Sequence, residues 1–137
     1  MAKPLERTQQ VPLLSAVDLA ARYAHLALLP REVLVVVGLD RRGLLLCETL
    51  VRGQVGHVAV RPGEALRAVV ASGAAALALV HNHPSGRGQP SAADVAFTGR
   101  MAAAARLLGL ALLDHVVVAS RGWCSMAERG LLLRPPR

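Results

Sequence analysis

The stretch ALALVHNHPSGRGQPSAAD, residues 76–94, decides the fold of this 137-residue chain. Its first five residues are all apolar, which is typical of a central strand that is buried on both faces. Two histidines separated by one residue follow, and Pro84 then ends the strand. A loop rich in glycine, proline and serine leads to Ser91, where we expect a long helix that runs through Leu108 and ends at Gly109.

Strands and helices alternate around this stretch. The expected helices share a helical spacing of apolar residues and a serine, proline or glycine at one end; they cover residues 15–25, 62–72 and 91–108. The expected strands are short apolar runs rich in β-branched residues; they cover residues 33–39, 44–51, 57–60, 76–83 and 111–119. The first two strands form a hairpin around a turn at 40–43. This order predicts an α/β domain with a mixed β-sheet flanked by helices.

The composition indicates one globular domain. Apolar residues make up 53% of the chain and charged residues 18%, which excludes an intrinsically disordered protein. The longest uncharged apolar run, residues 68–80, is shorter than the ~20 residues that cross a bilayer, so we expect no membrane span. The first residues lack the apolar segment of a secretory signal, and Cys47 and Cys124 stand far apart. We therefore predict a cytoplasmic protein with free thiols.

The formal net charge of +7 raises the question of a nucleic-acid partner. The arginines and lysines are spread along the chain, and no basic arm or block stands out. One tyrosine, one phenylalanine and one tryptophan are too few for the stacking surface that binders of single-stranded nucleic acid use. A nucleic-acid partner and a merely solvated basic surface both remain open.

His81, His83 and Asp94 form a candidate metal site. Residues i and i+2 of a strand point to the same face, so the two imidazoles can converge; at the end of the sheet we expect both rings near solvent. Asp94 follows Ser91 by three residues, in the first turn of the expected helix, where its carboxylate can face the histidines. Two imidazole nitrogens and one carboxylate, with the fourth position open to water, are typical of catalytic zinc.

The same residues have simpler interpretations. Ser91 and Asp94 have the spacing of a capping box, in which the serine caps the helix and the acid bonds back to the serine backbone, although glutamate or glutamine is the usual partner. The two histidines could equally be the polar edge of a loop. His115, beside Asp114 in the last expected strand, either orients a metal ligand or is an ordinary buried histidine.

A composite motif connects these residues to a known family. His-x-His-Pro, then six residues, then Ser-x-x-Asp resembles the JAMM or MPN metalloprotease domain, and residues 81–94 match it at every position. HNHPSG, PSxxD and the following Thr98 are similar to the RadC group of that superfamily. Further positions that look like RadC are Gly109, Asp114, His115, Ser125, Glu128 and Gly130. The resemblance runs from about Glu32 to Leu132.

The resemblance implies a zinc-dependent peptidase or isopeptidase with a cytidine deaminase-like α/β fold and one Zn²⁺ per chain. By this resemblance the two histidines and Asp94 are the metal ligands, and an upstream glutamate is the general base. Glu32, at the start of the first strand, fits that place better than Glu48 in the second strand. Ser91 would donate a hydrogen bond to the oxyanion.

The resemblance also divides the chain and suggests its partners. Residues 1–30 would form an N-terminal helical extension and residues 31–133 the catalytic domain. RadC proteins usually carry a helix-hairpin-helix region before that domain, and residues 1–30 are too few for it. We expect a peptide or protein substrate and no membrane partner, and the apolar terminal segments are consistent with a homodimer.

Two other classes of function remain as alternatives. One is a nucleic-acid-associated protein in DNA repair or recombination, either a metal-dependent nuclease or a binding module. It is suggested by the charge and by the usual association of RadC proteins. The other is a scaffold that a metal stabilises and that turns over no substrate.

Overall fold

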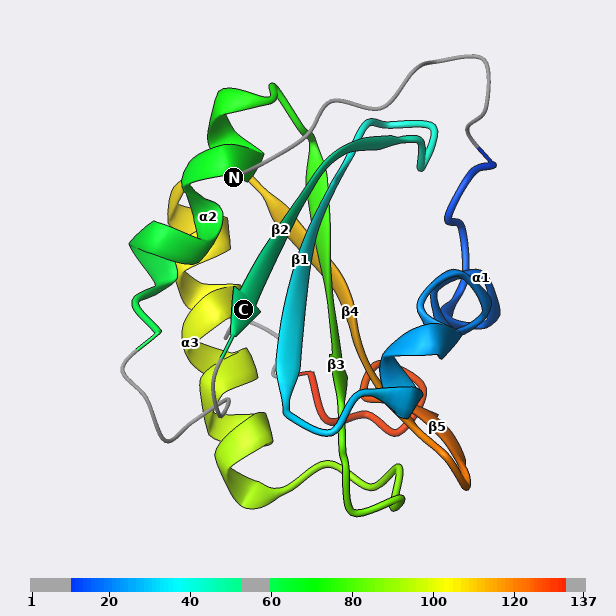
Figure 1. Ribbon diagram of the computed structural model, residues 1–137. Helices are drawn as coiled ribbons and strands as arrows, with labels where there is room; N and C mark the ends of the chain where they lie inside the picture. The colour runs from blue at the N-terminus through cyan, green and yellow to red at the C-terminus, as the bar shows by residue number, and fades with distance from the viewer. Residues whose placement is uncertain (1–10, 53–59, 133–137) are drawn as a thin grey trace.

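The computed structural model describes residues 11–52 and 60–132, which form one five-stranded sheet with helices on both faces (Figure 1). The strands are β1 Val33–Leu39, β2 Leu45–Arg52, β3 Ala76–Asn82, β4 Ala111–Ala119 and β5 Gly122–Ser125. They lie in the order β2-β1-β3-β4-β5, with β3 and β4 parallel and the other neighbours antiparallel. The predicted α/β class and the mixed sheet are confirmed.

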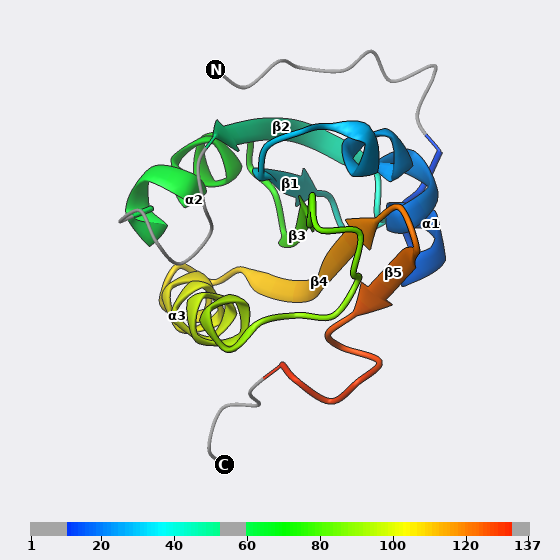
Figure 2. The same cartoon turned by 60° about the horizontal axis from the view of Figure 1, so that its bottom comes forward.

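The helices form a layer on each side of the sheet (Figure 2). These helices are α1 Ala16–Arg22, the 3₁₀ helix η2 Ala24–Leu28, α2 Pro62–Ala71 and α3 Ala92–Leu107. We call the side covered by α1 and η2 the α1 face; its core includes Leu19 and Val80. The side covered by α2 and α3 is the α3 face; its core includes Leu79 and Phe97. None of the helices in the described ranges has both the length and the apolarity needed to span a membrane.

The central strand β3 sends its side chains alternately to the two faces. It is buried over its whole length because β1 and β4 pair with its two edges and helices cover both of its sides. Leu79 packs in the core of the α3 face and Val80 in the core of the α1 face. Because this alternation continues to the end of the strand, His81 points to the α3 face and Asn82 to the α1 face.

The side chain of Asp40 closes the β1–β2 hairpin at the other end of the sheet. Its Oδ1 accepts hydrogen bonds from the backbone nitrogens of Arg42 (2.8 Å) and Leu44 (2.9 Å). Gly43 has a φ of 80°, a left-handed conformation that glycine adopts without the steric penalty of a Cβ. The predicted turn at 40–43 is therefore confirmed.

Several details differ from the expectation. One helix is predicted to about residue 25, but Tyr23 leaves the helical region (φ −107°, ψ 15°) and the chain continues as the 3₁₀ helix. β5 is an additional strand that was not predicted, because its four residues, which begin with a glycine, are too few to show a strand pattern. Of the strand predicted at 57–60, residues 57–59 lie outside the described residues, and Val60 is not in a strand. The division of the chain after residue 30 stays a prediction.

The parallel pairing of β3 with β4 contains one irregularity. Leu77 lies opposite Leu112, and the next residue of β3 lies opposite Asp114. The pairing therefore passes over Leu113. An extra residue of this kind is left unpaired and bends its strand locally.

Candidate metal centre

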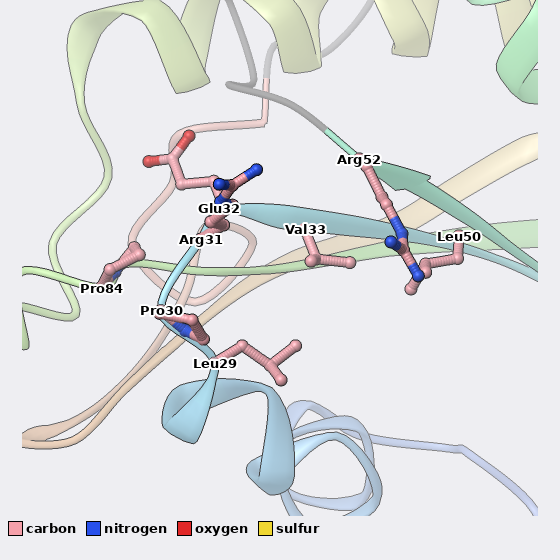
Figure 3. A pocket seen from close by; sticks show the side chains of 8 residues that line it. All are labelled: Leu29, Pro30, Arg31, Glu32, Val33, Leu50, Arg52 and Pro84. Atoms are coloured by element: carbon pink, nitrogen blue, oxygen red, sulfur yellow. The ribbon is translucent and has the colours of Figure 1, made fainter.

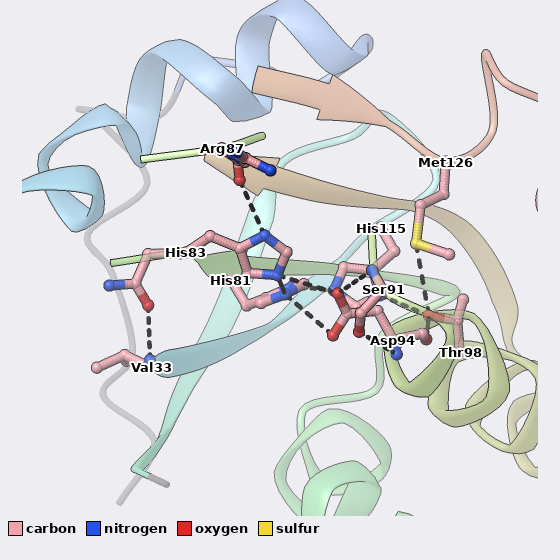
Figure 4. Close-up of polar contacts among 10 residues, drawn as sticks. Val33, His81, His83, Arg87, Ser91, Asp94, Thr98, His115 and Met126 are labelled. Atoms are coloured by element: carbon pink, nitrogen blue, oxygen red, sulfur yellow. Dashed lines mark hydrogen bonds and ion pairs between the residues drawn. The ribbon is translucent and has the colours of Figure 1, made fainter. Parts of the chain in front are cut away.

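Three side chains that the sequence predicts as metal ligands come together at the end of β3 (Figure 4). The Nε2 atoms of His81 and His83 lie 2.9 Å apart. One carboxylate oxygen of Asp94 lies 3.2 Å from Nε2 of His81, and the other lies 3.0 Å from Nε2 of His83. Within the described part of the chain, this is the one group of three or more such side chains whose ligand atoms lie close enough to hold a metal ion. We call it the His81–His83–Asp94 group.

The first turn of α3 fixes the position of Asp94. The Ser91 hydroxyl accepts a hydrogen bond from the backbone nitrogen of Asp94 (3.0 Å), and the Asp94 carboxylate accepts one from the backbone nitrogen of Ser91 (2.8 Å). The capping box is thus present, and the carboxylate that completes it also faces the two histidines. Because the Ser91 oxygen acts as an acceptor in the cap, its own hydroxyl proton is left as a donor.

The neighbours of Asp94 favour the ionised form of its carboxyl group. Burial raises the pKa of the Asp94 carboxyl, but hydrogen bonds from His81 and His83 outweigh burial and hold that pKa well below its ordinary value. The carboxylate is therefore ionised at neutral pH. An ionised oxygen ligand is the form that binds a divalent metal.

His83 presents its Nε2 to the group because its other ring nitrogen is occupied. Its Nδ1 lies 3.0 Å from the backbone oxygen of Arg87. A carbonyl oxygen only accepts, so Nδ1 carries the hydrogen and the neutral ring has its lone pair on Nε2. The hydrogen bond to Asp94 raises the pKa of His83 against the opposing effect of burial, and the charge of Glu32 adds to the rise.

His81 is completely buried, whereas His83 is partly exposed. The expectation that both rings lie near solvent is therefore wrong for His81. The reason is that β1 and β4 flank β3 up to this point, where His81 pairs with Leu34 on one side and Val117 on the other. The first turn of α3 then covers the ring through Asp94.

A relay of hydrogen bonds connects His81 to α3. His81 Nδ1 lies 2.6 Å from His115 Nε2, and His115 Nδ1 lies 2.6 Å from the Thr98 hydroxyl. That hydroxyl donates to the backbone oxygen of Asp94 (2.7 Å). Since the Thr98 proton is used there, Thr98 accepts from His115 Nδ1–H, and His115 Nε2 accepts from His81 Nδ1–H. In its neutral form, His81 thus presents an unprotonated Nε2 to the group.

The sequence alone did not connect His115 and Thr98 to each other. Burial holds the pKa of His115 well below its ordinary value, and the adjacent His81 lowers it further, so the ring is neutral as the relay requires. The neighbouring Asp114 has a different role. Its carboxylate accepts hydrogen bonds from the Ser125 hydroxyl and from the backbone nitrogen of Ala127, which joins β4 to the last residue of β5 and to the chain that follows it.

Glu32 lies directly before β1 and lines a cavity of about 740 Å³ (Figure 3). Pro84, the residue after His83, lines the same cavity. In Figure 3 the Glu32 carboxylate lies on the opposite side of the segment from Leu29. The charge of Glu32 is a minor cause of the raised pKa of His83. Its role as general base stays a prediction.

The competing glutamate, Glu48, lies on the other face of the sheet. It pairs with Val37, which belongs to the core of the α1 face, and residues directly opposite in a sheet share a face. The Tyr23 hydroxyl donates a hydrogen bond to the Glu48 carboxylate (2.6 Å), and Arg22 lies 3.7 Å from it. Burial, together with this hydrogen bond, raises the pKa of Tyr23 above its ordinary value. Glu48 is thus engaged away from the His81–His83–Asp94 group.

The donors of the group fit a zinc ion. Two neutral imidazole nitrogens and one carboxylate are the ligand set of many catalytic zinc sites. With metal–ligand distances of about 2.0–2.2 Å, a tetrahedral site separates its ligand atoms by roughly 3.3–3.6 Å. The separations of 2.9, 3.0 and 3.2 Å are a few tenths of an ångström shorter, so small side-chain movements would suffice.

Comparison with known proteins finds relatives over most of the chain. The family model described as the RadC-like JAB domain matches residues 14–131. A UPF0758 protein of Rhodobacter capsulatus is 43% identical over 129 residues, which cover 92% of this chain and 60% of that protein. A UPF0758 protein of Bordetella avium is 45% identical over 104 residues, which cover 75% of this chain and 46% of that protein. The chain thus spans about half to three fifths of the length of these curated relatives.

Proposed function

This chain belongs to the RadC-like JAB domain family, and from that premise we propose that it is a zinc-dependent peptidase or isopeptidase. The observation that carries the proposal is the His81–His83–Asp94 group, in which the Nε2 atoms of both histidines converge with the Asp94 carboxylate while the Nδ1 atom of each ring is engaged in a hydrogen bond elsewhere. The reaction would be hydrolysis of a peptide or isopeptide bond.

The chemistry divides between the metal and the protein. Zinc, when bound, supplies a Lewis acid that polarises the scissile carbonyl and lowers the pKa of a coordinated water to about 7. Glu32 takes a proton from the attacking water and delivers it to the leaving amine. Ser91, whose hydroxyl proton the helix cap does not use, donates a hydrogen bond to the carbonyl oxygen as negative charge develops there.

The cavity beside Glu32 is the substrate site in this proposal. Its lining is mostly apolar, with two arginines; the lining residues besides Glu32 are Leu29, Pro30, Arg31, Val33, Leu50, Arg52 and Pro84. Pro84, which follows His83 directly, places one end of this cavity next to a metal ligand. A concave site lined by apolar side chains with few polar groups is typical of ligand pockets.

Metal content and cleavage test the proposal together. The purified protein is analysed for zinc, iron, manganese and nickel, and then assayed with a panel of fluorogenic peptides and isopeptide-linked peptides, with and without a chelator. We expect zinc at one equivalent per chain, cleavage that the chelator abolishes, and recovery when zinc is restored. A protein that holds no divalent metal, and gains no activity from added zinc, would contradict the proposal.

Two matched substitutions test the general base. Glu32→Gln should lower kcat by about 10²–10⁴-fold, the usual contribution of general acid–base catalysis, and leave zinc content unchanged. Glu48→Gln, on the other face, should retain activity. Retained activity in the first variant and loss in the second would reverse the assignment.

The net charge of +7 supports a second candidate, a nucleic-acid-associated function. Binding through phosphate contacts weakens steeply as salt rises. Affinity for duplex and single-stranded DNA, measured between about 50 and 200 mM salt, therefore tests this candidate. Binding that is absent, or that does not depend on salt, would exclude it. A metal-stabilised scaffold would instead show a Tm that falls on chelation and no cleavage.

A further inference from the structure

Asn82 stands between the two histidines and bonds to the chain on both sides of Glu32. Its Oδ1 accepts a hydrogen bond from the backbone nitrogen of Val33 (2.7 Å), which is drawn in Figure 4. Its Nδ2 donates to the backbone oxygen of Arg31 (2.9 Å). One side chain therefore holds the residue before Glu32 and the residue after it.

The two partners define the orientation of the amide. The backbone nitrogen of Val33 only donates and the backbone oxygen of Arg31 only accepts, so a flipped Asn82 amide would lose both bonds. Asn82 is completely buried, and a buried amide is stable only when its polar atoms are paired. We call these two hydrogen bonds the Asn82 clamp. They allow the amide only one orientation.

The clamp holds the segment where the sheet does not. The pairing of β1 with β3 begins at Leu34, which lies opposite His81, so Arg31 and Glu32 lie beyond this ladder. Strand alternation sends His81 toward the α3 face and Asn82 toward the α1 face. The same two residues of β3 therefore present a metal ligand on one side and hold the chain that carries Glu32 on the other.

We propose that Asn82 is a positioning residue that fixes Glu32 beside the His81–His83–Asp94 group. This inference rests on the proposed function, in which Glu32 moves the proton. Asn82 is not a member of that group, and its side chain bonds to the backbone of Arg31 and Val33. Its loss should impair the reaction and leave metal binding unchanged.

The test compares two side chains that each make two hydrogen bonds to backbone groups at opposite ends of β1. Asn82→Ala removes the clamp near Glu32, and Asp40→Ala, the matched control, removes the pair at the distant turn. Asn82→Asp keeps the acceptor for the Val33 nitrogen and loses the donor to the Arg31 oxygen. Three quantities are measured for each variant: hydrogen exchange of the Val33 amide, zinc affinity, and turnover of a cleaved member of the peptide panel.

The expected results separate the clamp from a general loss of structure. In Asn82→Ala the Val33 amide should exchange about tenfold faster relative to the core amides of β3. Zinc affinity should stay within about twofold. The kcat should fall by about 10- to 100-fold with little change in KM, because a displaced general base is still present. Asp40→Ala should change none of the three, and Asn82→Asp should keep part of the Val33 protection.

Three outcomes would overturn the inference: an unchanged kcat in Asn82→Ala, an unchanged Val33 exchange rate, or a loss of zinc affinity as large as that of kcat. The last would mean that Asn82 acts on the adjacent histidines rather than on Glu32. A wild-type protein that binds zinc and cleaves nothing overturns the proposed function instead. In that case the Val33 amide still decides whether Asn82 holds the segment.

Discussion

Buried polar side chains occur on both faces of the sheet, but they find their partners differently. On the α1 face, Asn82 and Asp114 bond mainly to backbone groups. On the α3 face, His81, His115 and Thr98 bond to one another. Bonds to the backbone fix the course of the chain, whereas the relay fixes which nitrogen of each ring carries a proton. The bonds on the α1 face thus fix the backbone around the site, and those on the α3 face fix the tautomers of its histidines.

The largest expected effect is on zinc affinity, when the charge of Asp94 on the α3 face is removed. Asp94→Asn keeps the size of the side chain and an oxygen that can accept from the Ser91 nitrogen, so the helix cap should persist. Zinc affinity should fall by more than about 100-fold, because changes behind a ligand already lower metal affinity 10- to 100-fold. Competition with a chromophoric chelator measures this affinity. Wild-type affinity in Asp94→Asn would remove Asp94 from the ligand set.

A core substitution on the α1 face should lower stability without changing zinc affinity. Leu19 is buried in the core of that face, and Leu19→Ala should lower the free energy of unfolding by about 2–5 kcal/mol through the cavity it leaves. Zinc affinity of the folded protein should not change. Urea unfolding and the chelator competition give the two numbers. If zinc affinity falls in step with stability, the two faces are not independent.

Two hydroxyl groups on opposite faces allow a finer comparison. Thr98→Val leaves the His115 Nδ1–H without an acceptor, which should cost about 1–3 kcal/mol of stability and lower zinc affinity about tenfold. Tyr23→Phe removes the bond to Glu48 and should cost about 1 kcal/mol. It should leave zinc affinity unchanged. Equal effects of both variants on zinc affinity would contradict a relay confined to the α3 face.

The smallest effect is a pH dependence on the α1 face. Tyr23 is the one tyrosine in the sequence, so absorbance of the tyrosinate at alkaline pH reports it alone. Its pKa is raised in the folded protein, so the folded state stays protonated at a pH where the unfolded chain has lost its proton. The contribution of Tyr23 to the free energy of unfolding should therefore be constant below a pH of about 10 and fall above it. Tyr23→Phe should lose this fall, and a Tyr23 that titrates normally in the folded protein would contradict it.

The sequence predicted the parts of the site that follow from local geometry. His81 and His83 converge because alternate residues of a strand share a face, and Asp94 faces them because the helix begins at Ser91. The apolar runs also predicted the strands from β1 to β4. Each of these conclusions needs only the residues within one element or the next.

The parts that were not predicted depend on contacts between distant elements. The burial of His81 comes from two neighbouring strands and from α3, none of which can be placed on it from its own sequence. The bond between Thr98 and His115 crosses from α3 to β4, and the bonds of Asn82 reach back about fifty residues along the chain. Short β5 carries too little pattern to be recognised.

The β3–β4 pairing passes over Leu113, and at this residue the even- and odd-numbered side chains of β4 exchange faces. Before Leu113, the even-numbered Leu112 packs against the core of the α3 face. After it, the even-numbered Val116 and Val118 lie in the core of the α1 face. His115 therefore reaches His81 because the pairing passes over Leu113. If Leu113 took a regular place in the ladder, opposite Ala78, the same histidine would turn to the opposite side. The relay depends on a count of residues as much as on their chemistry.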